Sequence, residues 1–125
     1  PCKTRRQRQM CIRDRVEAVA NDPRSCTVEV QAGANMLAFT SGNQTPWGHP
    51  LVPTSKLSTD PRMAYLKPEW IDFNIGRLLL EGADPYEIAV QLLLHFRDVA
   101  SGLVLTRAEV NGSTSNVLTQ KAMIF

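Results

Sequence analysis

The chain has 125 residues, of which 43% are hydrophobic, and a formal net charge of +2. This length provides one modest core, so we expect one domain or part of a larger one. No apolar run approaches the roughly 18 residues of a membrane span, and no signal-peptide pattern is present, so we predict no membrane partner.

The positive charge is concentrated at the start of the chain. Residues 1–15 carry a net charge of +5, and the other 110 residues carry −3. A basic arm for nucleic acid is the ordinary interpretation of such a block. Residues 5–15 (RRQRQMCIRDR), however, reproduce without a mismatch one translation frame of the end of a widely used transposon sequencing adapter. We therefore expect residues 1–15 to be an adapter-derived, disordered artefact, and we predict no nucleic-acid partner.

The next elements in chain order are two strands and a long loop. Residues 26–31 (CTVEVQ) alternate apolar and polar side chains, which predicts a half-buried strand. Cys26 within them is the only cysteine beyond residue 15, which fits a reducing cytoplasm. Residues 36–39 (MLAF) predict a buried strand. Residues 40–55 contain three prolines and two glycines, too many breakers for a helix or a central strand, and so predict a loop.

Two further strands are predicted downstream of this loop. Residues 55–59 (SKLST) favour a short strand, followed at residues 60–70 by a turn with a helical piece stopped by Pro68. Residues 70–73 (WIDF) favour another strand, and residues 74–82 turn out of it.

The clearest helix spans residues 84–102. Asp84 stands at its N-cap, Pro85 in its first turn, Glu87 at the capping-box position and Gly102 just beyond its end. One apolar stripe consists of Ile88, Leu92, His95 and Val99. Strands alternating with a capped helix predict an α/β fold with a partial, open, mostly parallel sheet and flanking helices.

Ligands of open α/β sheets gather in the loops beyond the carboxyl ends of the strands. Two stretches here have that placement and carry hydrogen-bonding groups, ionisable groups or glycines that let a ligand approach the backbone. The candidates are Gly42, Thr45, Gly48, His49 and Lys56 in the first stretch, and Asp72, Asn74, Gly76 and Arg77 in the second. The guanidinium of Arg77 suits a bidentate pair with a carboxylate. The structural alternative makes Asp72 a cap, pairs Arg77 with Glu81 and leaves His49 and Lys56 without a chemical role.

Two blocks resemble the C-terminal part of the altronate and galactarate dehydratase family. MLAFTSGNQTPWGHPLVPTSKLST (residues 36–59) is similar to the family's strand followed by Phe-Thr-Thr-Gly-Arg-Gly-Thr-Pro. KPEWIDFNIGRLLLEG (residues 67–82) resembles its Lys-Pro-x-Trp-Ile-Asp-Phe-Asn-Ala-Gly-Arg stretch. The dipeptide at residues 43–44, Asn-Gln, replaces the family's Arg-Gly and removes a guanidinium from the first loop.

The resemblance implies a hydro-lyase that converts a sugar acid, altronate or galactarate, to a 2-keto-3-deoxy acid in the cytoplasm with a divalent metal, iron(II). It also implies that residues 16–125 are a C-terminal fragment, inactive alone, whose partners are the missing N-terminal domains. The substrate-binding residues that it implies are Gly42, Thr45, Gly48, Lys56, Asp72, Asn74 and Arg77. His49 is the candidate catalytic acid or base, and the metal ligands are left unassigned.

Alternatives remain open. A sulfolactate sulfo-lyase-like enzyme of the same superfamily fits the altered dipeptide at residues 43–44, and a non-catalytic domain for a small ligand is a further possibility. A homo-oligomer is one open form of assembly.

Overall fold

The structure, a computed structural model, describes residues 21–77 and 82–115. The expectations for residues 1–15, and the predicted pairing of Arg77 with Glu81, lie outside these ranges. Within them, no helix has the length and apolar character needed to cross a membrane.

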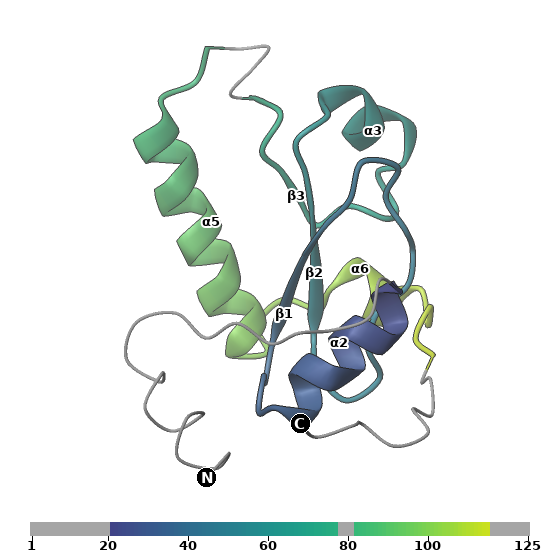
Figure 1. Ribbon diagram of the computed structural model, residues 1–125. Coiled ribbons are helices and arrows are strands. Elements are labelled where there is room, and N and C mark those ends of the chain that lie inside the picture. Colours follow the sequence, from purple (N-terminus) through teal and green to yellow (C-terminus); the bar gives the residue numbers. More distant parts are fainter. Residues whose placement is uncertain (1–20, 78–81, 116–125) are drawn as a thin grey trace, which may run out of the picture.

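Three short parallel strands make the sheet (Figure 1). β1 (Leu37–Thr40) pairs with β2 (Thr54–Ser58), and β2 pairs with β3 (Phe73–Asn74), so that β2 lies in the centre. All five residues of β2 are buried, as is typical of a strand that is paired on both sides. The predicted α/β fold with a partial, open, parallel sheet and flanking helices is therefore confirmed.

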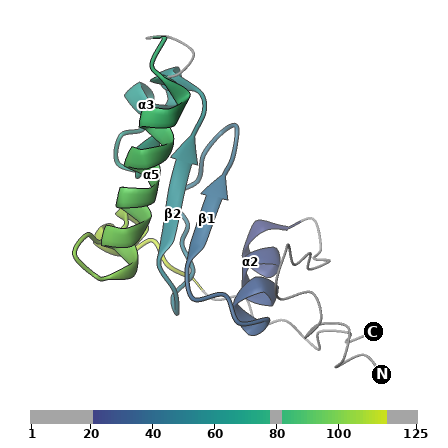
Figure 2. The ribbon, with the colours of Figure 1, turned by 90° about the vertical axis from the view of Figure 1, so that its left-hand side faces the viewer.

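The long helix α5 (Pro85–Ala100) begins and ends where its capping signals predict. The Asp84 side chain accepts a hydrogen bond from the Tyr86 N–H at 3.0 Å. Gly102 adopts a positive φ of 72° just after the helix, a conformation that glycine reaches at little cost. Figure 2 shows α5 running alongside the strands, with α2 (Asp22–Gln31) on their other side.

The predicted apolar stripe of α5 packs against the sheet. Ile88 and Val99 are buried near its two ends. Between them, His95 Nε2 lies 2.7 Å from the Ser55 Oγ of β2, and the His95 ring centroid lies 5.6 Å from that of Phe73 in β3. His95 is thus an interface histidine between helix and sheet.

Two shorter helices also contact β2: α3 (Pro61–Leu66) and α6 (Arg107–Val110). α3 begins at Asp60, whose side chain accepts a hydrogen bond from the Arg62 N–H, and it ends before Pro68 as predicted. α6 begins with a capping box formed by Thr106 and Glu109. The backbone N–H and the hydroxyl of Thr106 both donate to Glu109 Oε2.

The strand predicted at residues 26–31 is wrong, because these residues form the second half of α2. Helix-start signals just upstream decide the local structure. The Asn21 side chain caps the helix by accepting a hydrogen bond from the Arg24 N–H at 3.3 Å, and Pro23 occupies the first turn. Cys26 and Thr27 are adjacent and both buried, which alternation along a half-buried strand would not produce.

The other strand predictions hold with shifted bounds. Residues 36–39 and 55–59 correspond to β1 and β2, each displaced by one residue. The strand predicted at residues 70–73 begins later, because the Trp70 N–H donates to the Lys67 carbonyl in a turn. Hydrogen bonding to β2 starts where the Asp72 N–H donates to the Lys56 carbonyl at 2.9 Å.

Candidate functional site

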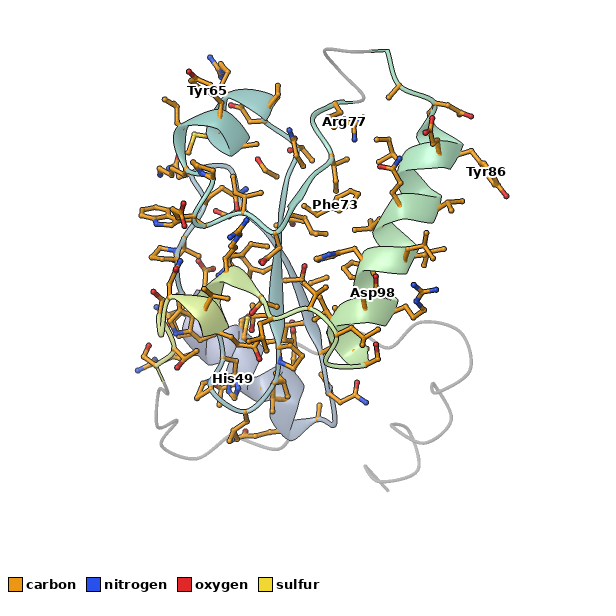
Figure 3. The ribbon with its side chains drawn as sticks, turned by 180° about the vertical axis from the view of Figure 1, so that it is seen from behind. His49, Tyr65, Phe73, Arg77, Tyr86 and Asp98 are labelled. Atoms are coloured by element: carbon orange, nitrogen blue, oxygen red, sulfur yellow. The ribbon has the colours of Figure 1, made fainter. Side chains whose placement is uncertain are left out.

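The candidate residues divide between two edges of the sheet. Because the strands are parallel, their last residues lie at one edge, here called the carboxyl edge, and their first residues lie at the opposite amino edge. Residues 41–53 leave β1 at the carboxyl edge and return to the amino edge to enter β2. Figure 3 shows the result, with Arg77 and His49 toward opposite ends of the molecule.

Gln44 anchors the loop at the carboxyl edge. Its side-chain Nε2 donates to the carbonyls of Ser41, in the same loop, and of Leu57, in β2. Its backbone adopts a positive φ of 58°, which is uncommon for a residue other than glycine. Its Oε1 is buried and has no hydrogen-bond partner in the part of the chain that the structure describes. Gln44 thus holds a left-handed turn that brings the loop back onto β2.

Lys56, at the middle of β2, is fully buried. Its ammonium donates to the carbonyls of Pro46 and Trp47 at 3.1 and 3.2 Å. Burial lowers the pKa of Lys56 from 10.5, and the negative charge of Asp72 partly opposes that shift. Within this chain, the ammonium therefore holds the loop to β2, and its predicted contact with substrate stays a prediction.

Asp72 connects three elements. One carboxylate oxygen, Oδ2, accepts from the backbone N–H of Lys56 at 2.7 Å, and the other, Oδ1, accepts from that of Arg107 at 2.6 Å. Asp72 thus caps the first turn of α6 without being its N-cap residue, and anions are stabilised at this end of a helix.

The turn after β3 brings Asn74 and Arg77 to the carboxyl edge. Asn74 Oδ1 accepts from the Gly76 N–H at 2.9 Å, which leaves the Asn74 amide NH₂ as a donor. Gly76 is buried, and a Cβ there would lie 2.6 Å from Pro61 N, so only glycine fits. Arg77 is exposed, with one guanidinium nitrogen 3.5 Å from Gln91 Oε1 of α5.

His49 lies at the amino edge, and its side chain is almost fully buried. Its backbone N–H donates to Thr54 Oγ1 at 2.9 Å, and its Nδ1 accepts from the Leu51 N–H at 3.2 Å. Nδ1 is therefore unprotonated, and Nε2 carries the proton but has no hydrogen-bond partner among residues 21–77 and 82–115. Burial lowers the pKa of His49 from 6.5, which favours this neutral form.

The other candidate loop residues are placed as follows. Gly42 is exposed near the carboxyl edge, and a Cβ there would meet nothing within 4 Å. Thr45 Oγ1 accepts from the Trp47 N–H at 3.3 Å. Gly48 is buried at the amino edge, where its N–H donates to the Ser113 carbonyl at 3.0 Å.

Sequence reasoning missed a cationic contact at the carboxyl edge. The Lys67 ammonium donates to the Asn43 carbonyl at 2.8 Å and lies 4.5 Å from the centre of the Trp70 ring. Lys67 opens the Lys-Pro-x-Trp block, so the spacing of Lys67 and Trp70 was the available signal. The contact ties residues 67–70 to the first loop.

The described residues do not form a metal centre by themselves. Across residues 21–77 and 82–115, no group of three His, Cys, Asp or Glu side chains is placed to hold an ion. Because His49 Nδ1 accepts a hydrogen bond, the ring proton lies on Nε2. A protonated ring nitrogen has no lone pair for a metal, so Nε2 is in the wrong form for a metal ligand. The described residues therefore do not fit the implied iron.

Polar loops and an exposed arginine lie at the carboxyl edge of this parallel sheet, the edge at which ligands of open α/β sheets gather. The sequence model of D-galactarate/altronate dehydratase, C-terminal, matches residues 13–124. The chain belongs to this family.

Two curated relatives are altronate dehydratases. The chain is 38% identical over 88 residues to that of Bacillus subtilis (strain 168), a match that covers 70% of this chain and 17% of the relative. It is 37% identical over 83 residues to that of Escherichia coli (strain K12), covering 66% of this chain and 16% of the relative. The chain thus spans about one-sixth of the length of these relatives.

Proposed function

We propose that the chain is the C-terminal part of a cytoplasmic hydro-lyase that dehydrates a sugar acid, altronate or galactarate, to a 2-keto-3-deoxy acid. Family membership and the two altronate dehydratase relatives support this proposal. The longer protein, here called the parent protein, would comprise residues 16–125 and the preceding domains. The isolated chain would be inactive, because it supplies only one wall of the site.

One observation of the structure carries the proposal: Arg77, which is exposed, and Asn74 lie in the same turn after β3, at the carboxyl edge. A sugar acid presents a carboxylate next to hydroxyl groups. Arg77 would bind that carboxylate in a bidentate pair, and the Asn74 NH₂ would donate to a neighbouring hydroxyl. Gly76 fixes the turn between them, so their relative placement is set before substrate arrives.

The chemistry explains why a cation is needed there. The proton beside a carboxylate is weakly acidic, and its removal puts negative charge on the carboxylate oxygens. Arg77 would stabilise that charge while a base removes the proton. The predicted acid or base role of His49 requires the preceding domains to bring substrate to the amino edge, because His49 and Arg77 lie toward opposite ends of this chain.

The remaining loop candidates would shape the substrate pocket. Gly42 is open to solvent at the carboxyl edge and leaves room for a ligand to reach the backbone. Thr45, Gly48, Lys56 and Asp72 would act by holding the loops in place. Iron(II) would need ligands from outside the described ranges, since no group of three His, Cys, Asp or Glu side chains within them is placed to hold an ion.

The test compares two arginine variants of the parent protein. We expect Arg77→Ala to lower kcat/KM for altronate or galactarate by roughly a hundredfold, since a charge-assisted pair contributes about 2 to 3 kcal/mol. Arg62→Ala is the matched control, because Arg62 is exposed on α3 and its ion pair within the described ranges is a local one with Asp60 at 3.0 Å. Unchanged kinetics for Arg77→Ala would remove Arg77 from the site.

The same preparation tests the alternatives. Release of sulfite from sulfolactate, without dehydration of either sugar acid, would replace the proposal with a sulfo-lyase. The observation behind the sulfo-lyase alternative is Asn43, an exposed residue at the position where the family has an arginine. Binding of a sugar acid without turnover would instead assign a non-catalytic domain.

A further inference from the structure

Helix α5 is apolar on two opposite faces. Its inner face, which includes Ile88, His95 and Val99, packs on the sheet. At 100° per residue, a second apolar stripe points the other way. Its members, with the exposed fraction of each, are Tyr86 (76%), Val90 (39%), Leu93 (67%) and Leu94 (45%). These four residues are here called the outer face of α5, and Figure 3 shows Tyr86 pointing away from the sheet.

A surface helix of a soluble protein has one apolar stripe, whereas a helix that is apolar on both sides is enclosed between two layers. The sheet is one layer. Charge on the outer face is also low: Arg97 shares its direction, but its guanidinium nitrogens bind Asp98 Oδ1 at 2.9 and 2.7 Å. Covering this face would therefore bury apolar side chains while the Arg97 charge keeps its partner.

We propose that the outer face of α5 is the docking surface for the polypeptide that precedes this chain in the parent protein. This inference rests on the proposed function for the existence of that polypeptide. The family description places the matched segment at the C-terminal end. About five-sixths of each curated relative lies outside the segment that matches this chain. A preceding region of that size is tethered to this chain, and the outer face offers it an apolar contact surface over residues 86–94.

The charges around the outer face argue against a lipid surface as its occupant. Helices that lie on membranes carry Lys and Arg on their polar face. Here the flanking residues Asp84, Glu87 and Asp98 are acidic, and Arg97 is the one Lys or Arg within Pro85–Ala100. An apolar protein layer fits this composition better than anionic lipid.

Cysteine labelling of the parent protein tests the inference. Leu93→Cys places a thiol on the outer face, and mass spectrometry follows its reaction with a maleimide in native and in denaturing solution. We expect native labelling to be at least roughly tenfold slower than labelling in denaturant, because reaction of a covered site needs local opening. Val110→Cys on α6 is the matched control, since Val110 is 61% exposed and lies off the outer face.

Comparable native and denatured rates for Leu93→Cys would overturn the inference. Slow native labelling that is lost on dilution would assign the face to a second copy and would also overturn it. Sugar-acid turnover by the unsubstituted parent protein is measured separately. Slow labelling of Leu93→Cys without turnover would support the docking surface and contradict the proposed function. Turnover with fast labelling would contradict the docking surface alone.

Discussion

Lys56 and Asp72 exchange two hydrogen bonds at the start of the β2–β3 ladder. The Lys56 N–H donates to Asp72 Oδ2 at 2.7 Å, and the Asp72 N–H donates to the Lys56 carbonyl at 2.9 Å. The second carboxylate oxygen accepts from the Arg107 N–H at 2.6 Å. Two residues that match the family motif thus hold each other in place and fix α6 against the sheet.

Asp72→Asn should destabilise this junction. An amide offers one acceptor oxygen where the carboxylate offers two, so either the Lys56 or the Arg107 N–H would face an NH₂ group. We expect a loss of about 2 kcal/mol, as for a hydrogen bond to a charged group. Native-state hydrogen exchange of the β2 amides in the parent protein measures it. Asp22→Asn, at an exposed site, is the control. If both variants lose the same small amount of stability, Asp72 does not stabilise this junction.

The left-handed backbone of Gln44 gives a second prediction. Both Gln44→Ala and Gln44→Gly lose the bonds to Ser41 and Leu57. Only Ala retains the strain of a φ of 58°. We therefore expect the Gly variant to be more stable than the Ala variant by about 1 kcal/mol, the reverse of their usual order in helices and strands. Thermal unfolding of the two parent-protein variants measures this difference in stability. A more stable Ala variant would contradict the left-handed backbone conformation at residue 44.

Gln44 also shows where sequence prediction succeeds and where it fails. The family's glycine at this position was a signal for an unusual backbone, but the sequence analysis predicted no left-handed residue there. Local signals predicted α5, because caps and an apolar stripe act over a few residues. The separation of His49 from Arg77 was not predictable, because it depends on where the loop crosses from one edge of the sheet to the other. The structural roles of Lys56 and Asp72 likewise depend on tertiary contacts that spacing does not encode.

Gly42 and Gly48 should respond very differently to alanine. A Cβ on Gly48 would lie 2.5 Å from Ala108 Cβ, so the loop or α6 must shift, at a cost of about 1 to 3 kcal/mol. A Cβ on Gly42 meets nothing within 4 Å, and we expect no loss of stability. Melting temperatures of the two parent-protein variants test this contrast. If Gly42→Ala nevertheless weakens sugar-acid binding, the ligand itself reaches Gly42.

The Ser55–His95 contact should couple α5 to β2. The two side chains lie 2.7 Å apart, and Ser55 is fully buried. Ser55→Ala leaves the His95 nitrogen without this partner, and His95→Phe does the same to the hydroxyl. A double-mutant cycle on the free energy of exchange should give a coupling of about 1 kcal/mol. Ser101→Ala at the exposed C-cap of α5 serves as the control, and additive single effects would show that the contact contributes nothing.

The burial of His49 predicts a pH dependence with a definite sign. Because its pKa in the fold lies below 6.5, the unfolded chain binds more protons than the folded chain between the two values. The stabilisation from neutral His49 is therefore fully present above 6.5 and is lost as the pH falls through the folded pKa. Protonation at Nδ1 would also remove the acceptor of the Leu51 N–H.

His49→Gln isolates this effect, because glutamine does not titrate. We expect the stability of the unsubstituted parent protein relative to the variant to fall as the pH is lowered from about 7.5 to about 5, with the change confined to values below the normal histidine pKa. Urea unfolding at several pH values, compared between the two proteins, cancels the contribution of carboxylates that both share. Parallel pH profiles would mean that His49 is exposed in the parent protein, where it would be accessible for the acid or base chemistry predicted for it at the amino edge.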